Sequence, residues 1–143
     1  MIEASMMIND RMPEYTVERA GKVLNRHKKA LNGSKVLILG VSYKADIDDY
    51  RESPAIHVIN EFKRFGSEIS FYDPYVAAYR DKGAEFTGLT EISPEMIKQF
   101  DLICITTGHT NVDYEMVCNA GVPVFDCRNI TKNVTNRENI ELL

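Results

Sequence analysis

The feature that most constrains the fold is an apolar run followed by a charged loop and a helical pattern. Residues 36–41 are apolar over the length of a strand and have no helical spacing, which is typical of a strand buried on both faces. Ser53 and Pro54 then form a helix cap and a first helical residue. This unit predicts an open α/β sheet whose ligand lies beyond the carboxyl ends of the strands, beside the loop after residue 41.

The rest of the chain repeats the alternation of strands and helices. Serine and proline again start a helical pattern at 93–100, and another helical pattern runs from 114 to 120. We expect a polar turn or short helix at 75–82. Strand patterns are found at 68–72, 84–87, 102–106 and 122–125. The alternation predicts a doubly wound, mostly parallel Rossmann-like sheet of the α/β class, with an additional N-terminal helix.

The N-terminal segment carries one apolar helical stripe. Residues 1–11 are expected to be a frayed end, and a helix is expected from Met12 or Pro13 to about Leu31. Its stripe, which includes Val17, Ala20 and Leu24, can either cap its own domain or meet a second copy of the chain, and the sequence leaves both alternatives open. We divide the chain into a helical segment at 1–32 and a domain at 33–143.

Composition limits the possible partners. The length of 143 residues suits one domain, and 44% hydrophobic and 27% charged residues are ordinary values for a globular protein. The net charge of −4 argues against a nucleic-acid partner or an anionic membrane surface. We find no signal peptide and no run long enough to span a membrane. A cytoplasmic location is therefore the expectation.

The loop after the first strand departs from the dinucleotide fingerprint. Placing G-x-G-x-x-G on Gly40 puts Ser42 at the second glycine, where a pyrophosphate normally approaches the backbone. The next acid at a strand end, Asp73, comes too late for the usual ribose contact. We therefore do not expect this chain to bind NAD in the usual way.

Four segments resemble the nucleotide-sugar dehydrogenases, also called the UDP-glucose/GDP-mannose dehydrogenase family. The longest is the signature from Gly40 to Pro54, which resembles the C-terminal, UDP-binding domain of that family. Residues 72–75 and 126–129 resemble its strand endings, and residues 12–15 resemble the start of its connecting helix. The resemblance covers nearly the whole chain.

The resemblance implies a function and several partners. It implies a UDP-sugar ligand, an N-terminal NAD-binding portion of the same protein, and a homodimer formed through the N-terminal helix. The family oxidises the C6 alcohol of the sugar to a carboxylate with NAD and a cysteine nucleophile. The loop is most similar to the branch that uses a UDP-N-acetylhexosamine, with UDP-glucose as the other candidate.

No catalytic residue is assigned to this chain. The cysteine of the family lies in a glycine-rich motif, and Cys104, Cys118 and Cys127 have no such surroundings. The first two are expected to be small buried side chains. We expect the chain alone to be inactive.

Three side chains are predicted to meet at the carboxyl edge of the sheet. Lys44 can neutralise a phosphate, Arg128 can bind a ribose or phosphate through several donors, and Tyr43 can pack on a ring. The alternative is that Tyr43 packs on the sheet, Lys44 is solvated and Arg128 pairs with an acid. His109 is a weaker candidate, expected to be an exposed loop histidine without a catalytic partner.

The acidic residues of the loop are given a structural role. Asp48 or Asp49 is expected to pair with Arg51 and to fix the loop, and no metal site is expected because EF-hand spacing is absent. A second class of function is a binding or receiver-like module without chemistry, in which Asp49, Asp73 and Thr106 imitate a phospho-receiver pocket. The spacing argues against that module, because Asp49 follows the first strand by too many residues.

Overall fold

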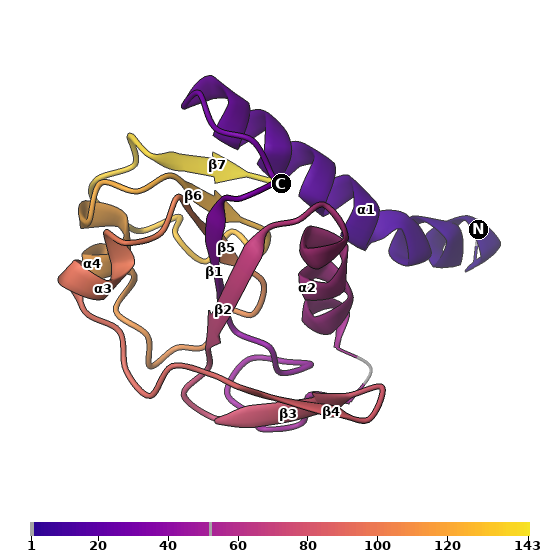
Figure 1. Cartoon of the computed structure of the whole chain (residues 1–143). Coiled ribbons are helices and arrows are strands. Elements are labelled where there is room, and N and C mark those ends of the chain that lie inside the picture. Colours follow the sequence, from indigo (N-terminus) through magenta and orange to yellow (C-terminus); the bar gives the residue numbers. More distant parts are fainter. Residues whose placement is uncertain (1, 52) are drawn as a thin grey trace.

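Five parallel strands form the main sheet of the computed structural model, in the order β2-β1-β5-β6-β7 (Figure 1). The structure describes the backbone of residues 2–51 and 53–143 and the side chains of residues 12–51 and 53–143. The elements are α1 (Ile2–Arg26), β1 (Lys35–Leu39), α2 (Pro54–Arg64), β2 (Glu68–Tyr72), β3 (Ala78–Asp81), β4 (Ala84–Thr87), α3 (Pro94–Ile97), β5 (Leu102–Ile105), α4 (Tyr114–Asn119), β6 (Val124–Asp126) and β7 (Ile140–Leu142).

Helices cover both faces of this sheet. Side chains alternate across β1, so Val36 and Ile38 join α1 and α2 in one hydrophobic cluster, whereas Leu37 and Leu39 join α3 and α4 in the other. In Figure 1 the two helix pairs lie on opposite sides of the strands. The predicted doubly wound α/β fold is confirmed, and the apolar run at 36–41 reflects burial on both faces.

The predicted starts of α2 and α3 are also confirmed. The Ser53 hydroxyl accepts a hydrogen bond from the Ala55 N–H, and Pro54 is the first residue of α2. Ser93 caps α3 in the same way, although α3 ends at Ile97, three residues before the predicted end.

The boundaries predicted for α1 are wrong at both ends. The backbone is helical from Ile2, so Pro13 lies inside the helix, while residue 1 lies outside the described part. Proline suits a first turn but can also lie within a helix at the loss of one backbone hydrogen bond. The helix ends at Arg26, and Leu31 then returns to pack beside Gly21.

The apolar stripe of α1 lies inside its own domain. Val17, Ala20 and Leu24 are each 0% exposed and belong to the cluster that also contains α2. Of the two alternatives left open by the sequence, the structure supports the one in which the stripe caps its own domain, and contact of these residues with a second copy is wrong. A dimer formed through α1 would therefore have to use another face of the helix.

Two strands were not predicted. Residues 78–81 form β3, which pairs with β4 in an antiparallel hairpin through Lys82 and Gly83, both at positive φ. The expected polar turn or short helix at 75–82 is wrong, because Tyr79 is buried against Phe71 and Phe86. The other strand is β7, which extends the sheet beyond β6. None of the described helices is long and apolar enough to cross a membrane.

Candidate functional site

A cleft of about 600 Å³ lies at the carboxyl ends of β5 and β6, beside the start of α2. It brings together the loop after β1, the two strand ends and one side of α1. The predicted residues Tyr43, Lys44 and Arg128 all line it. The other lining residues are Met12, Pro13, Thr16, Pro54, Ala55, Val58, Thr106, Cys127 and Leu143. Sequence reasoning did not place α1 in this wall, because its residues are distant in the chain.

Lys44 and Tyr43 are exposed on the loop after β1. The Tyr43 side chain is 47% exposed, and the Lys44 ammonium lies 5.9 Å from the centre of its ring. Tyr43 therefore does not pack on the sheet. An aromatic face and a cation are presented side by side to the cleft.

Arg128 follows β6 and is held by two hydrogen bonds, one from its side chain and one from its backbone. Its Nε donates to the Thr106 carbonyl at 2.9 Å, and its N–H donates to Asp126 Oδ1 at 2.9 Å. Among the described residues, neither Arg128 nor Lys44 forms an ion pair with a carboxylate. Both cations can therefore receive an anionic ligand.

The acidic loop contains an ion pair between Asp49 and Arg51. Asp49 Oδ1 accepts from Arg51 Nε at 3.0 Å, and Asp49 Oδ2 accepts from its terminal nitrogen at 3.1 Å. This pair and the hydrogen bonds to Arg51 hold the pKa of the Asp49 carboxyl below its ordinary value. The partner is Asp49, whereas Asp48 is exposed. Among the described residues, no group of three or more His, Cys, Asp or Glu could hold a metal ion.

His109 is buried, and its expected exposure is wrong. It is 0% exposed, its Nε2 lies 2.8 Å from Asp73 Oδ2, and its Nδ1 accepts from the Asp46 N–H at 2.8 Å. These partners lie 36 and 63 residues away in sequence, so no local pattern could reveal them.

Asp73 occupies the backbone donors that follow β1. Its Oδ2 accepts from the N–H groups of Val41 at 2.8 Å and Ser42 at 3.1 Å. In a dinucleotide site the loop backbone at this point approaches a pyrophosphate, and here a carboxylate is hydrogen-bonded to it instead. The residues present therefore do not fit the dinucleotide of NAD. The Asp73 side chain is also 0% exposed. This burial argues against a receiver-like pocket, in which the carboxylate would have to be accessible.

Gly40 has a packing reason that does not involve a nucleotide. Its φ is +89°, and an added Cβ would lie 2.4 Å from the Thr107 carbonyl oxygen. Glycine is thus required where the end of β1 approaches the end of β5.

The buried thiols are poor nucleophiles. The hydrogen bond with Cys127, together with burial, raises the pKa of Cys104 well above its ordinary value. Burial raises the pKa of Cys118 to about 11. At neutral pH both are thiols and do not attack a substrate. Cys127 is half-buried at the edge of the cleft.

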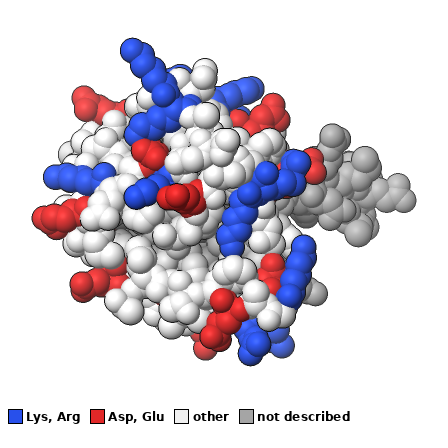
Figure 2. Space-filling view, viewed as in Figure 1, with Lys and Arg blue, Asp and Glu red and all other residues white. Residues whose placement is uncertain are grey.

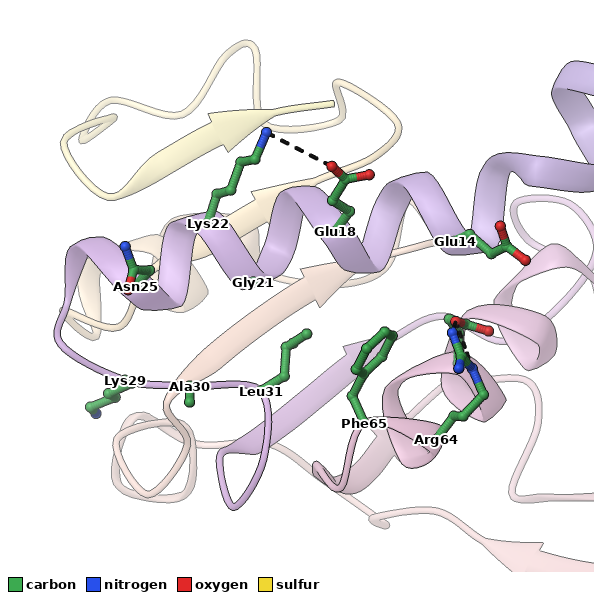
Figure 3. Close-up of a pocket in the computed structure, with 11 residues that line it drawn as sticks. Glu14, Glu18, Gly21, Lys22, Asn25, Lys29, Ala30, Leu31, Arg64 and Phe65 are labelled. Atoms are coloured by element: carbon green, nitrogen blue, oxygen red, sulfur yellow. Dashed lines mark hydrogen bonds and ion pairs between the residues drawn. The ribbon is translucent and has the colours of Figure 1, made fainter.

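A second hollow, of about 650 Å³, lies between α1 and α2, away from the carboxyl edge (Figure 3). The side chains of Leu31 and Phe65 project toward α1 in this view. Its three cations each have a carboxylate partner: Lys22 has Glu18, Lys29 has Asp101 and Arg64 has Glu61. We call this hollow the α1–α2 groove. On the face shown in Figure 2, basic and acidic side chains are interspersed.

Comparison with a family model gives one match. Residues 37–133 match the model described as the UDP-glucose/GDP-mannose dehydrogenase family, UDP binding domain. The matched region begins in β1 and ends after Arg128, so it includes Tyr43, Lys44 and Arg128.

Individual relatives agree with that match. The chain is 33% identical over 142 residues to a UDP-N-acetyl-D-mannosamine dehydrogenase of Methanocaldococcus jannaschii, covering 96% of this chain and 30% of the relative. It is 29% identical to a UDP-N-acetyl-D-glucosamine 6-dehydrogenase of Salmonella typhi, covering 76% of this chain and 25% of the relative. The chain thus spans about a third or less of these relatives.

Solved structures show the same fold. A UDP-D-ManNAc dehydrogenase from Pyrococcus horikoshii superposes with a TM-score of 0.74 at 25% identity, covering 95% of this chain and 31% of that chain. An NDP-N-acetyl-D-galactosaminuronic acid dehydrogenase from Methanosarcina mazei gives a TM-score of 0.78 at 22% identity, covering 96% and 30%. The second likeness concerns the fold alone.

Proposed function

The chain belongs to the UDP-glucose/GDP-mannose dehydrogenase family, and from this premise we propose that it binds the nucleotide of a UDP-sugar as part of an NAD-dependent nucleotide-sugar 6-dehydrogenase. The proposed substrate is a UDP-N-acetylhexosamine, in line with the names of the relatives in M. jannaschii and S. typhi. UDP-glucose is the second candidate.

One observation carries the proposal. Lys44 and Arg128 come from opposite ends of the matched region, line the same cleft and have no carboxylate partner among the described residues. Two cations without counter-charges in one concave site favour an anionic ligand such as a diphosphate. The start of α2 also lies in the cleft wall through Pro54 and Ala55, and a helix start favours negative charge.

Each residue has a distinct proposed role. The Lys44 ammonium is a point charge for a phosphate, and the Arg128 guanidinium donates to phosphate or ribose oxygens from its terminal nitrogens while Nε stays on Thr106. The exposed Tyr43 ring packs on the uracil. None of these side chains abstracts or donates a proton in this proposal, so the site binds and orients the substrate.

The remaining functions are assigned to the rest of the enzyme. NAD, which supplies the hydride acceptor, and the catalytic thiol are proposed to reside in the N-terminal portion of the full-length protein. The division at residue 32, the homodimer and the cytoplasmic location stay predictions. Since the stripe of α1 is buried, a dimer would use the outer face of that helix, where Tyr15 is 47% exposed.

The test is calorimetric titration of the chain with UDP, UDP-N-acetylglucosamine, GDP-mannose and NAD+. UDP and the UDP-sugar should bind, whereas NAD+ should not. Lys44→Ala should weaken UDP binding by about tenfold or more, because a charge-assisted contact contributes on the order of 1–3 kcal/mol. The matched control is Lys22→Ala in the α1–α2 groove, which should leave the affinity unchanged. Equal affinities for all three proteins would contradict the assignment.

A second measurement concerns turnover. The chain alone should not form NADH from NAD+ and any of these nucleotide sugars, because Asp73 occupies the loop N–H groups that a dinucleotide approaches and the raised pKa values of Cys104 and Cys118 keep both as thiols. Activity should appear only when the N-terminal portion is present. Turnover by the purified chain that disappears in Cys127→Ser would contradict this division of roles.

A further inference from the structure

The unexplained feature next to the cleft is the fully buried His109. Its ring is held by Asp73 at the end of β2 and by Asp46 in the loop after β1. The imidazole thus connects the loop that carries Lys44 with the segment that follows β2. No role in binding or chemistry requires this residue to be buried there.

The hydrogen bonds determine the tautomer of His109. The backbone N–H of Asp46 can only donate, so Nδ1 must accept and the ring proton is on Nε2. Nε2 donates to Asp73 Oδ2 at 2.8 Å. The Ser42 hydroxyl, 3.1 Å from Nε2, donates its own proton to the Lys44 carbonyl at 2.7 Å, so its oxygen is available as a second acceptor.

Hydrogen bonds hold the backbone both before and after Lys44 in the sequence. Before it, the Tyr43 N–H donates to the Asp49 carbonyl at 2.7 Å, and the Ser42 hydroxyl donates to the Lys44 carbonyl itself. After it, Asp46 has a φ of 62°, which a non-glycine residue rarely adopts. The His109 ring holds the Asp46 N–H, and Thr110 holds its carboxylate at 2.8 and 2.9 Å.

We propose that His109 is a positioning residue that fixes the loop and thereby presents the Lys44 ammonium to the diphosphate of the ligand. The inference rests on the proposed function and adds to it a residue that does not touch the ligand. Without the ring, the Asp46 N–H loses its acceptor and the left-handed turn loses a contact that maintains it. Lys44 would then have to be ordered when the ligand binds, which reduces the affinity for phosphate.

The two ring nitrogens can be tested separately. In His109→Asn, the side-chain oxygen lies near the position of Nδ1 and can accept from the Asp46 N–H; in His109→Gln, the amide nitrogen lies near Nε2 and can donate to Asp73. The loop contact predicts that asparagine restores function better than glutamine. The control is His57→Gln, which changes an exposed histidine on α2.

The experiment compares UDP with uridine, which lacks the phosphates. His109→Ala should weaken UDP binding about tenfold and uridine binding less than about twofold, where tenfold corresponds to about 1.4 kcal/mol. His109→Asn should recover most of the UDP affinity. In the same proteins the Asp46 amide should exchange slowly with solvent in wild type and in His109→Asn, and rapidly in His109→Ala.

Other outcomes separate the inference from the proposed function. If the wild-type protein does not bind UDP, both the proposed function and the positioning role of His109 are contradicted. Wild-type binding with unchanged affinity in His109→Ala, or an equal loss for UDP and uridine, overturns the positioning role alone. If His109→Ala does not fold, the comparison of His109→Asn with His109→Gln carries the test, because only asparagine can accept from the Asp46 N–H. The asparagine variant should bind UDP several-fold more tightly than the glutamine variant, and equal UDP affinities of the two would overturn the role.

Discussion

The cleft at the carboxyl edge and the α1–α2 groove have similar volumes, about 600 and 650 Å³, but different chemistry. In the groove, Lys22, Lys29 and Arg64 each lie within ion-pair distance of a carboxylate. In the cleft, Lys44 and Arg128 have no such partners among the described residues. The comparison shows that size does not identify a ligand site here. What distinguishes the cleft is positive charge that has no carboxylate partner in the described part of the chain, on a backbone held by hydrogen bonds.

The largest effect is expected from removing the buried Asp73 carboxylate, which holds the backbone beside the cleft. Asp73 accepts five hydrogen bonds, from the N–H groups of Val41, Ser42, Tyr75 and Val76 and from His109. Asp73→Ala removes the carboxylate acceptor of the Val41, Ser42 and Tyr75 N–H groups, so the free energy of unfolding should fall by about 3–5 kcal/mol. Urea unfolding followed by circular dichroism measures it.

The control for Asp73 is Asp48→Ala on the exposed part of the same loop. It should change the free energy of unfolding by less than about 0.5 kcal/mol. Equal effects of the two substitutions would show that the Asp73 network does not stabilise the fold.

The next effect concerns the two faces of α1. Leu24 is 0% exposed against α2 and the sheet, so Leu24→Ala should reduce the free energy of unfolding by about 2–5 kcal/mol. Lys22→Ala, on the outer face, should change it by less than about 0.5 kcal/mol. If Leu24→Ala instead changes only the molar mass in light scattering and leaves unfolding unchanged, the stripe contacts another chain.

A smaller effect separates the cations of the two hollows. Arg128→Lys keeps the charge but loses the geometry in which Nε binds Thr106 while the terminal nitrogens stay available. UDP affinity should fall by about tenfold in calorimetry. The matched change Arg64→Lys in the groove should leave UDP affinity unaltered, and a comparable loss there would mean that the hollows are not chemically distinct for this ligand.

The smallest effect concerns thiol reactivity. Iodoacetamide at pH 8 should label Cys127 before Cys104 and Cys118. The pKa values of Cys104 and Cys118 are raised, so both stay protonated and unreactive at this pH. Since Cys127 lines the cleft, UDP should slow its labelling. Mass spectrometry of peptides measures the order, and equal labelling with and without UDP would place the nucleotide elsewhere.

Local chemistry made much of the fold predictable. The strand at residues 36–41 and the helix caps at Ser53 and Ser93 are encoded by residues that are close together in the chain. The sequence alone predicted all three. The hairpin of β3 and β4 was missed because its turn is made by Lys82 and Gly83 rather than by a stronger turn pair such as Asn-Gly.

The site was only partly predictable for a related reason. Tyr43, Lys44 and Arg128 follow strands that end at one edge, so topology alone brings them together. The burial of His109 depends on Asp73 and Asp46, whose side chain and backbone reach it from distant segments. A histidine in the loop between β5 and α4 carries no sequence signal for such partners, and its loop position suggested exposure.

The most direct measurement is a two-dimensional amide NMR titration of the chain with UDP. The account predicts that the resonances that shift belong to residues 43–46, 106–107 and 127–128, around the cleft. Those of residues 18–31 and 61–65, around the α1–α2 groove, should stay in place. Shifts confined to the groove, or an absence of shifts at saturating UDP, would contradict the assignment of the nucleotide to the cleft.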